Sequence, residues 1–264
     1  MREYNISEVA KMFGISSESL RNYERKGLIA PLRGENGYRT YTKPDIYLLS
    51  GIRFLRNAGF SLEDVEKLCR ATYDEGLAIR RTRCQELEKE IEYLTCKLQA
   101  MRTEYDDFES LKSCDSIART ISPAMLRLNN QVNDSFLIDD ASILEWVEHM
   151  PIVRISPAFS KEAVLSGRDE VRFGYAVPLE LARPLKLDRT PGAEIKKPQE
   201  CLTTVICSRG ERYLSSCMLK HVLQSCRDQS LTLTEDVWGI TIGTHTEDGQ
   251  IIRCHRLYFP VGPV

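Results

Sequence analysis

The sequence has no long apolar run. No stretch approaches the roughly 18 apolar residues that a membrane-spanning helix needs, and the opening MREYNISEVAKMFG carries charges where a secretory signal peptide is apolar. These absences predict a cytoplasmic protein without a membrane partner. The 264 residues, 42% hydrophobic and 28% charged, have an ordinary globular composition and suit two domains better than one.

Enzyme signatures are absent as well. The sequence contains no Gly-rich phosphate loop, no His-Glu-x-x-His motif and no Gly-x-Ser-x-Gly elbow. No nucleophile is spaced for pairing with a base, and the histidines are scattered: His149, His221, His245 and His255. We therefore predict that the protein is not an enzyme, has no catalytic residues and needs no cofactor.

Nine cysteines are present, yet no two form a Cys-x-x-Cys pair. Structural disulfides are rare in a reducing compartment, so we expect free thiols that serve mostly as small buried apolar residues. Cys217 and His221 are one helical turn apart but fit an apolar stripe, whereas Cys254 and His255 would point to opposite faces of a strand. Neither pair predicts a metal site.

Charge is unevenly distributed along the chain, although the formal net charge is only −2. Residues 1–60 contain ten Lys/Arg and six Asp/Glu, whereas residues 61–114 contain nine and thirteen. A basic start and an acidic middle indicate that the two segments have different electrostatic roles.

Two short helices are predicted near the start. The first, in ISEVAKMFGIS, takes Ser7 as its N-cap and turns at Gly14. The second begins at Ser16 or Ser17 and ends at Gly27. Two such helices joined by a tight turn are typical of a helix-turn-helix, whose second helix shows polar side chains to the DNA major groove.

The second helix, in SLRNYERKGLI, is crowded with polar residues at its centre. In a helix-turn-helix, Arg21 and Tyr23 would reach the DNA while Leu20 and Leu28 hold the helix on its scaffold. A merely solvated amphipathic helix is the alternative for this span alone.

The next segment favours DNA binding. PLRGENGYRTYTKPDI predicts a β-hairpin that turns at residues 35–37 and carries Arg33, Arg39 and Tyr41. Arginines on such a wing lie against phosphates, where contacts set register and raise affinity. Two further helices are predicted over residues 45–57 and 61–69, with a near capping box at the start of the second.

These consecutive motifs resemble the winged helix-turn-helix of the MerR-type transcription regulators: YNISEVAKMFGIS, SLRNYERKGLI, NGYRTY and IRFLRNAGFSLEDV. The resemblance covers roughly the first seventy residues and implies double-stranded promoter DNA as a partner. The family usually has two aromatics before the glutamate of this helix, and here Asn22 replaces the first. The resemblance places these side chains at the DNA: Ser17, Arg21, Tyr23, Arg33, Tyr38 and Arg39, with Arg56 adding a phosphate contact.

From Cys84 to Phe108, apolar residues recur at alternating spacings of three and four, with Glu, Lys and Arg filling most positions between. A narrow apolar stripe on a polar helix needs a partner helix, so the period predicts a coiled-coil seam and a homodimer. A core helix of a monomer is the alternative. The family resemblance implies an antiparallel coil that places two DNA-binding domains on a pseudopalindromic site. The predicted seam residues are Leu87, Ile91, Leu94, Leu98, Met101 and Tyr105.

About 140 residues follow the coil, more than a metal-sensing loop needs. Their strand and helix patterns alternate and predict an α+β domain with an antiparallel sheet. The element order, FGYAV and the final Leu-Tyr-Phe-Pro resemble the GyrI-like effector-binding domain, which has two β-α-β-β halves about a central cleft. The predicted domains are a mostly α, winged helix-turn-helix DNA-binding domain (1–75), a dimerisation helix (76–112), a linker (113–121) and the GyrI-like domain (122–264).

Aromatic residues gather in this last domain. Aromatic walls with a buried carboxylate suit flat lipophilic cations, although any single aromatic is better explained as core. Related drug-binding domains often carry a glutamate two residues before the tyrosine of the last strand, and here Arg256 takes that position. A neutral or anionic ligand therefore stays open, unless Glu145 or another acid supplies the charge. The candidate effector-binding residues are Glu145, Trp146, Phe173, Tyr175, Tyr213, Trp238, Arg256 and Tyr258.

We predict a homodimeric transcription regulator, an activator that responds to a small organic, drug-like effector. The resemblance implies that the dimer binds the promoter spacer and that the effector-bound form distorts the DNA, so that RNA polymerase engages both promoter elements. One alternative is a thiol-based metal or redox sensor in which Cys84 and Cys114 of different subunits bind Cu(I) or Hg(II), although the loop LKSCDSIART offers only one cysteine. Another is an enzyme or sequestering module fused to a DNA-binding head.

Overall fold

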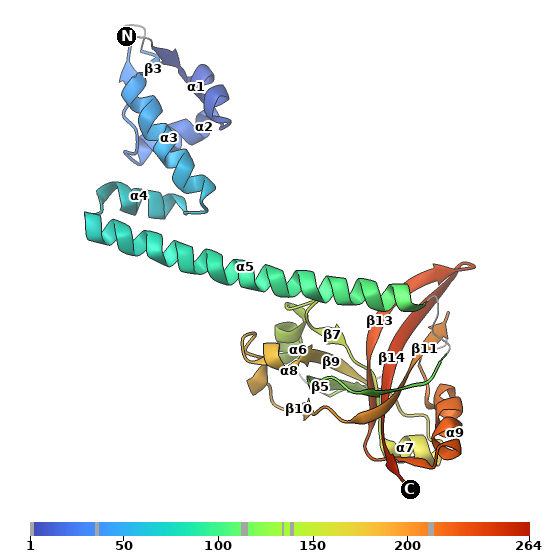
Figure 1. The fold of residues 1–264 in the computed structure, drawn as a ribbon. Coiled ribbons are helices and arrows are strands. Elements are labelled where there is room, and N and C mark those ends of the chain that lie inside the picture. Colours follow the sequence, from blue (N-terminus) through green and yellow to red (C-terminus); the bar gives the residue numbers. More distant parts are fainter. Residues whose placement is uncertain (1–2, 35–36, 112–115, 134, 138–139, 211–213) are drawn as a thin grey trace. The chain divides into compact units, whose positions relative to one another are not determined.

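The structure is a computed structural model that describes residues 3–34, 37–111, 116–133, 135–137, 140–210 and 214–264. It consists of two compact units, Met1–Glu92 and Tyr93–Val264. The dividing line falls inside the long helix α5, Tyr73–Ser110 (Figure 1). Within the described residues, no helix is both long and apolar enough to cross a membrane.

The first unit is helical and has one small sheet. Strand β3 is the centre of this sheet and pairs antiparallel with β1 and with β2, so β2 and β3 form a hairpin. Residues 35–36, at the predicted turn, lie outside the described part of the chain. The elements are β1 (Tyr4–Asn5), α1 (Ile6–Phe13), α2 (Ser17–Arg25), β2 (Leu32–Arg33), β3 (Arg39–Tyr41), α3 (Lys43–Asn57), α4 (Leu62–Arg70) and the start of α5.

Side-chain caps set the starts of the short helices. Asn5, and not Ser7, caps α1, because its side chain accepts hydrogen bonds from the amides of Ser7 and Glu8 while Glu8 bonds back to the amide of Asn5. The predicted cap at Ser7 is therefore wrong, and Ser7 lies in the first turn. The other cap predictions are confirmed: Ser16 caps α2, and Ser61 forms a capping box at α4.

One apolar core holds the first unit together. Leu20 and Leu28 belong to it, as the helix-turn-helix pattern predicts. Tyr23 also belongs to it and is only 7% exposed. Helix α2 therefore contributes more of its length to the core than its polar sequence indicates.

The second unit is built around a large antiparallel sheet, as predicted. Its strands are β4 (Ala118–Ile121), β5 (Met125–Val132), β6 (Ser135–Phe136), β7 (Arg154–Ile155), β8 (Ala158–Phe159), β9 (Arg172–Pro178), β10 (Ala193–Lys196), β11 (Glu200–Arg209), β12 (Leu231–Leu233), β13 (Val237–Glu247) and β14 (Gln250–Pro263). Its helices, besides the end of α5, are α6 (Asp140–Val147), α7 (Lys161–Ser166), α8 (Leu179–Ala182), η2 (Leu187–Arg189), η3 (Ser216–Leu219) and α9 (Lys220–Asp228). The helical segment η3 continues directly into α9, and residues 211–213 lie outside the described part.

The order of the strands repeats in mirror fashion. The main path runs β10-β5-β9-β8-β13-β14-β11-β4, so β5, β9 and β8 on one side correspond to β11, β14 and β13 on the other. Each half runs strand, helix, strand, strand along the chain, with α6 in the first half and α9 in the second. Two similar halves therefore meet where β8 pairs with β13.

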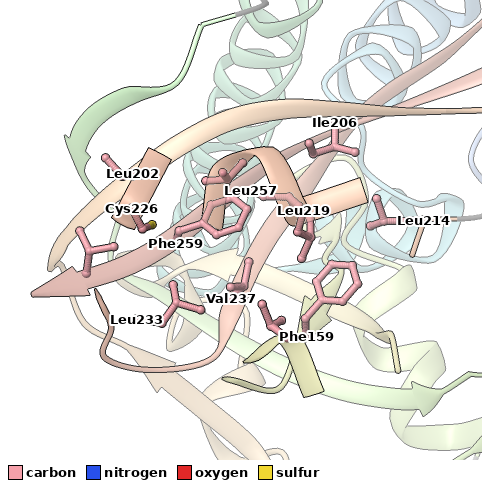
Figure 2. Packing of buried hydrophobic residues seen from close by; sticks show 13 residues of the cluster. Phe159, Leu202, Ile206, Leu214, Leu219, Cys226, Leu233, Val237, Leu257 and Phe259 are labelled. Carbon is pink, nitrogen blue, oxygen red and sulfur yellow. The ribbon is translucent and has the colours of Figure 1, made fainter. Parts of the chain in front are cut away.

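Each helix covers its own part of the sheet. Leu219, Val222 and Cys226, from η3 and α9, pack with Leu257 and Phe259 of β14 (Figure 2). A separate core surrounds Trp146 of α6 and includes residues of β5 and β9, with three residues of α5 packed against it: Tyr93, Cys96 and Ala100. The C-terminal part of α5 is therefore an integral part of the second unit.

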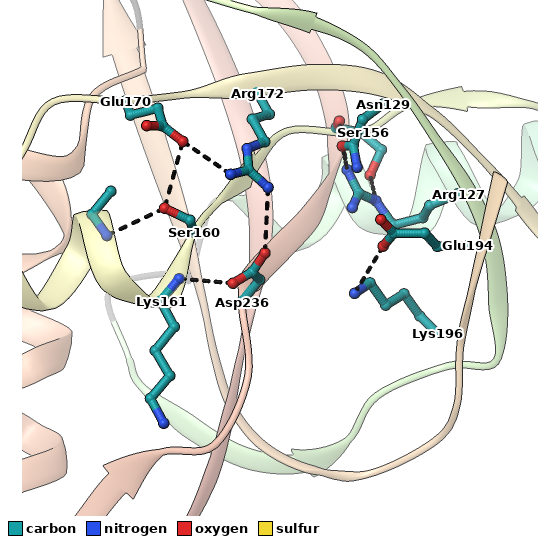
Figure 3. A network of polar contacts seen from close by, with 11 residues as sticks. Arg127, Asn129, Ser156, Ser160, Lys161, Glu170, Arg172, Glu194, Lys196 and Asp236 are labelled. Carbon is teal, nitrogen blue, oxygen red and sulfur yellow. Dashed lines mark hydrogen bonds and ion pairs between the residues drawn. The ribbon is translucent and has the colours of Figure 1, made fainter. Parts of the chain in front are cut away.

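A buried arginine joins the two halves. Arg127 of β5 is 1% exposed and donates hydrogen bonds to Ser156 Oγ (2.8 Å) and Asn129 Oδ1 (3.1 Å) (Figure 3). Ser156 Oγ in turn donates to the carbonyl oxygen of Gly239 in β13. Burial lowers the pKa of Arg127 to about 10, so the guanidinium keeps its charge at neutral pH and depends on these neutral acceptors.

One pair of cysteines departs from the expected free thiols. Cys207 of β11 lies directly opposite Cys254 of β14, and the two form a disulfide. A separation of 47 residues hides this pairing in the sequence, because only the strand register brings the two together. Of the free cysteines in the described part, Cys201 and Cys226 are buried, as expected, whereas Cys69, Cys84 and Cys217 are exposed.

Candidate nucleic-acid interface and ligand cleft

Glu24 connects helix α2 to the β2–β3 hairpin. Its Oε2 atom accepts a hydrogen bond from Arg39 Nε at 2.5 Å, and its Oε1 atom lies 3.8 Å from Arg33 Nη2. One carboxylate thus orients both arginines of the hairpin. The side chain of Arg33 remains 60% exposed, so its guanidinium is available to a phosphate.

The solvent-facing side of α2 carries a small charge network. Glu18 pairs with Arg21 (3.3 Å) and with Arg25 (3.0 Å), and all three side chains are exposed. Exposed pairs of this kind are weak. A DNA phosphate can therefore replace Glu18 as the partner of Arg21 at little cost.

Most of the predicted DNA-contacting residues lie at the surface of the first unit. Arg21, Arg33, Tyr38 and Arg56 are exposed, and Ser17 and Arg39 are partly buried. Tyr23 differs, because residues three apart share a helix face and Tyr23 follows Leu20 into the core. The ring of Tyr23 thus packs in the core, and its contact with DNA stays a prediction.

The predicted seam residues of α5 are exposed along the helix. Large apolar side chains usually avoid water, so a continuous row of exposed ones is unusual on a protein surface. The exposed members are Leu87, Ile91, Leu94, Leu98, Met101 and Tyr105. The end of the row differs, because Phe108 packs edge-on against His245 of β13.

The second unit contains a cleft of about 960 Å³. Its walls come from β5, β9, β11, β13 and β14 and from the residues before η3. Most lining side chains are amides, hydroxyls and aromatics, and they include Asn130, Asn133, Phe173, Tyr175, Ser208, Ser215, Thr241, Thr244, Arg253 and His255. Such a mixture of apolar walls and a few convergent polar groups is typical of a small-molecule site.

Two polar groups at the cleft are unusual. The hydroxyl of Ser208 is buried and has no hydrogen-bond partner among the described residues. His255 is 4% exposed, and its Nδ1 atom lies 3.0 Å from Thr241 Oγ1. Burial, together with the nearby charge of Arg253, lowers the pKa of His255 to about 4, so the imidazole is neutral at neutral pH.

The charged residues of the cleft already have protein partners. Asp169 Oδ1 accepts hydrogen bonds from the amide (3.0 Å) and the hydroxyl (3.3 Å) of Ser216. Arg253 Nη1 donates to the carbonyl oxygen of Gly210 at 2.9 Å. The cleft therefore offers mainly uncharged donors and acceptors to a ligand.

Only part of the predicted effector set lines this cleft. Phe173 and Tyr175 do. Trp146 is fully buried behind Tyr175, with its Nε1 atom donating to Thr190 Oγ1 at 3.1 Å. Glu145 is exposed on α6, and Tyr213 lies outside the described residues.

The other three predicted residues lie away from the cleft. Trp238 is fully buried, and its ring centroid is 4.8 Å from that of Tyr258. Arg256 donates hydrogen bonds to Asp107 (2.5 Å) and Ser110 (3.2 Å) of α5. Neighbouring side chains of a strand point to opposite faces, so His255 faces the cleft while Arg256 faces α5.

Comparison with known proteins identifies the first unit. The family model for the MerR HTH family regulatory protein matches residues 4–72. The HTH-type transcriptional regulator CueR of Salmonella typhi is 44% identical over 101 residues, which are 37% of this chain and 73% of that protein. This chain belongs to the MerR family. It is therefore a DNA-binding transcriptional regulator with a helix-turn-helix.

Two further matches are each similar to part of this MerR-family chain. A probable heavy metal-dependent transcriptional regulator of Haemophilus influenzae is 48% identical over 65 residues, which are 24% of this chain and 51% of that protein. The crystal structure of HiNmlR, a MerR family regulator lacking the sensor domain and bound to promoter DNA, is 26% identical. That match covers 42% of this chain and 90% of the other, with a TM-score of 0.36.

The thiols of this regulator do not gather into a metal site within the described residues. No group of three or more His, Cys, Asp or Glu side chains in that part of the chain could hold a metal ion. Cys84 is exposed on α5, and Cys114 lies outside the described residues. The alternative that joins these two cysteines across a dimer therefore stays a prediction.

Sequence reasoning missed most of the polar lining of the cleft. Asn130, Ser208, Thr241 and His255 lie on strands whose existence was predicted but whose facing side was not assigned. The alternation in IIRCHRLYFPV was the available signal, because it places His255 and Arg256 on opposite faces.

Proposed function

We propose that this MerR-family regulator is a homodimeric activator that binds a small, uncharged organic ligand in the cleft of its second unit. The observation that carries the proposal is the position of β14. This strand lines the cleft with Arg253 and His255 and contacts α5 through Arg256. A ligand that moves β14 therefore acts on the helix that also carries the predicted dimer seam.

A second connection runs through Thr241. Its hydroxyl is within hydrogen-bonding distance of His255 in the cleft, and its carbonyl oxygen accepts a hydrogen bond from Arg154 Nη2 at 3.1 Å. Arg154 Nη1 also binds Asp107 of α5 at 2.9 Å. Polar contacts thus link the cleft to α5 from both β13 and β14, which supports a ligand-dependent bias between two positions of the helix.

The ligand class follows from the lining. A lipophilic cation would need an acid free to pair with it, whereas the carboxylate of Asp169 already accepts two hydrogen bonds. The neutral His255 and the unpartnered Ser208 hydroxyl suit a ligand with uncharged hydrogen-bonding groups on a flat ring. Phe173 and Tyr175 supply apolar walls for that ring.

Dimerisation is proposed from the exposed seam of α5, as an antiparallel coiled coil. The first unit then acts as a winged helix-turn-helix on each half of a pseudopalindromic promoter spacer, and the second unit as a GyrI-like effector-binding domain. Ligand binding stabilises the dimer geometry that bends and untwists the DNA, so that RNA polymerase engages both promoter elements. The chain acts in the cytoplasm as a regulator and not as an enzyme.

The ligand step is tested by tryptophan fluorescence. Trp146 stacks on Tyr175, at the wall of the cleft, so a bound aromatic compound changes its emission. We would titrate matched neutral, cationic and anionic aromatic compounds into the wild type, Ser208→Ala and the exposed control Thr246→Ala. Saturable quenching by neutral compounds, weakened roughly fivefold in Ser208→Ala only, supports the proposal. A preference for cations that Ser208→Ala leaves unchanged contradicts the proposed ligand class.

The regulatory step needs a separate measurement. Transcription from a promoter with a lengthened spacer is measured with RNA polymerase, with and without the compound that binds most tightly. DNA bending is followed on the same fragment. Saturating compound should raise the transcript level and change the bend together. Ligand that binds without altering either quantity contradicts the activator mechanism and favours a sequestering module.

The dimer is tested with Leu94→Glu and Leu98→Glu, because both side chains lie in the exposed seam. Gln99→Glu, on another exposed face of the same helix, is the control. Light scattering should show dimers for the wild type and the control and monomers for the seam variants. Dimers in all four proteins would contradict the coil.

A second candidate is the thiol-based sensor of Cys84 and Cys114. The name of the Haemophilus relative and the exposure of Cys84 favour it. Induction by Cu(I) or Hg(II) that is lost in Cys84→Ser and in Cys114→Ser, but kept in Cys69→Ser, would establish this mechanism in place of the organic effector.

A further inference from the structure

The disulfide of the second unit lies at a defined place in the sheet. Cys207 and Cys254 face each other across the antiparallel pair of β11 and β14, with 4.2 Å between their Cα atoms. On its other side, Cys254 lies opposite Gly243 of β13. The bond therefore joins β11 to β14, beside the position on β13 where Phe108 of α5 packs.

The two sulfur-bearing residues differ in exposure. Cys207 is exposed, whereas Cys254 is 1% exposed. Both line a groove of about 600 Å³ whose other residues include Tyr105, Phe108, Glu109, Leu111, Arg209 and His245. A small molecule in this groove therefore meets the disulfide at its exposed residue, Cys207.

The same strand position contacts two functional regions. Arg253 and His255, on either side of Cys254, line the ligand cleft on the opposite face of the sheet. On the face of Cys254, Phe108 of α5 lies over Gly243, where an added Cβ would be only 3.1 Å from the ring. A shift of the backbone at Cys254 would therefore move residues that line the cleft and residues that contact the end of α5.

A transcription regulator works beside DNA, in a compartment where low-molecular-weight thiols keep most cysteines reduced. Disulfides that form in this compartment in mesophilic organisms are usually transient and either catalytic or redox-sensing. A buried disulfide would be protected from exchange, but the exposure of Cys207 removes that protection.

We propose that Cys207–Cys254 is a reversible thiol–disulfide site for low-molecular-weight thiols and their disulfides, and that its state controls how firmly β11 and β14 hold the end of α5. In reduction, a small thiolate attacks Sγ of Cys207. The sulfur–sulfur bond breaks, and Cys254 leaves as a thiolate that takes up a proton. A second small thiolate then attacks the small-molecule sulfur of the mixed disulfide, so that Cys207 leaves as a thiolate, takes up a proton and one small-molecule disulfide is released.

Oxidation is the reverse of this sequence. A small-molecule disulfide forms a mixed disulfide with Cys207, and the Cys254 thiolate then displaces the small thiol. Two thiols of the protein lose two electrons, and the small disulfide gains them as two thiols. This site is distinct from the Cys84 and Cys114 alternative, which requires a second subunit, and it needs no organic ligand in the cleft.

The site is tested first on the unmodified protein. Folded protein is equilibrated with mixtures of reduced and oxidised glutathione, quenched with acid, denatured, alkylated and analysed by peptide mass spectrometry. We expect the peptides of Cys207 and Cys254 to change from disulfide-linked to alkylated as the mixture becomes reducing, with glutathione on Cys207 as the intermediate. A pair that stays linked in every mixture, or one that is fully alkylated after prolonged exposure to oxidised glutathione, overturns the proposal.

Entry at Cys207 is tested with single variants. Cys254→Ser leaves an exposed thiol and Cys207→Ser leaves a buried one, so the reaction with oxidised glutathione should be about tenfold or more faster in Cys254→Ser. Equal rates contradict entry at Cys207. Cys217→Ser removes an exposed cysteine elsewhere and should leave the redox change of the pair intact.

The link to α5 is tested by hydrogen exchange of the wild type in both redox states. Reduction should speed amide exchange in peptides that cover residues 104–111 and 250–256, and leave the first unit unchanged. Identical exchange in the two states would show that the disulfide does not control the attachment of α5.

Discussion

Asp107 of α5 accepts a hydrogen bond from Arg256 of β14, with 2.5 Å between Oδ1 and Nη1. Its second oxygen accepts one from Arg154 at 2.9 Å. One carboxylate thus receives two arginines from different strands, and its side chain is only 14% exposed. This arrangement fixes the end of α5 to the sheet that forms the cleft.

Removing the charge of Asp107 should release this end of the helix. In Asp107→Asn, two partly buried guanidinium groups lose their carboxylate, so we expect the second unit to lose about 2 kcal/mol of unfolding free energy. Asp106→Asn, at the neighbouring exposed position, should change it by less than about 0.5 kcal/mol. Urea unfolding followed by tryptophan fluorescence measures both, because Trp146 and Trp238 lie in this unit. Equal stability of the two variants would show that the ion pairs are not structural.

Protonation of His255 should make the second unit sensitive to acid. Its folded pKa is about 4, against 6.5 for the unperturbed group, because burial disfavours the charged ring. Between these values the unfolded chain binds the proton and the folded protein does not. Stability should therefore be complete above about pH 6.5 and fall as the pH decreases towards 4, by about 3 kcal/mol at most.

The measurement is urea unfolding over this pH range. His255→Gln should lose that part of the pH dependence, while His221→Gln, at an exposed position on α9, should keep it. A wild type with the same pH profile as His255→Gln would show that the buried imidazole does not contribute.

Local signals explain why the first unit could be predicted well. Its helices start at polar caps and end near glycines. Each helix boundary is therefore determined by residues next to it in the sequence. Ser61 with Asp64 is such a case, and the structure confirms it. The prediction of the α1 cap was wrong because Asn5 and Ser7 are both good cap residues. Which of them caps the helix depends on where β1 ends.

Pairings between distant residues explain the failures in the second unit. The strands and the antiparallel sheet followed from alternation and composition, but the register of β13, β14 and β11 did not. Without that register, the tryptophans were assigned to a ligand site although both are core residues. The Cys207–Cys254 bond and the contact of Arg256 with Asp107 depend on the same register.

Replacing two glycines of the first unit with alanine should change its stability in opposite directions. Gly51 lies inside α3, and an added Cβ would meet no atom within 4 Å, so Gly51→Ala should stabilise the unit by about 0.5–1 kcal/mol. Gly59 has φ +86°, a left-handed conformation that alanine rarely adopts, so Gly59→Ala should destabilise it by more than about 1 kcal/mol. Thermal unfolding of the two variants decides the point, and a shared sign would contradict the backbone argument.

Substitutions of Arg21 and Tyr23 should affect different properties, although both residues lie on α2. The Arg21 variant should lose DNA binding, and the Tyr23 variant should lose stability. Arg21 is exposed, so Arg21→Gln should weaken promoter binding at every salt concentration, reduce the salt slope by about one and leave unfolding unchanged. Tyr23→Ala removes a core ring and should cost about 3 kcal/mol of unfolding free energy. Lys67→Gln, on the exposed side of α4, is the control for net charge and should leave the salt slope as it is.

Fluorescence anisotropy on promoter DNA over a salt series, with thermal unfolding of each variant, distinguishes the two roles. If Tyr23→Phe, which keeps the ring in the core, weakens DNA binding as much as Arg21→Gln does, then the hydroxyl of Tyr23 contacts DNA and the purely structural assignment of this residue fails.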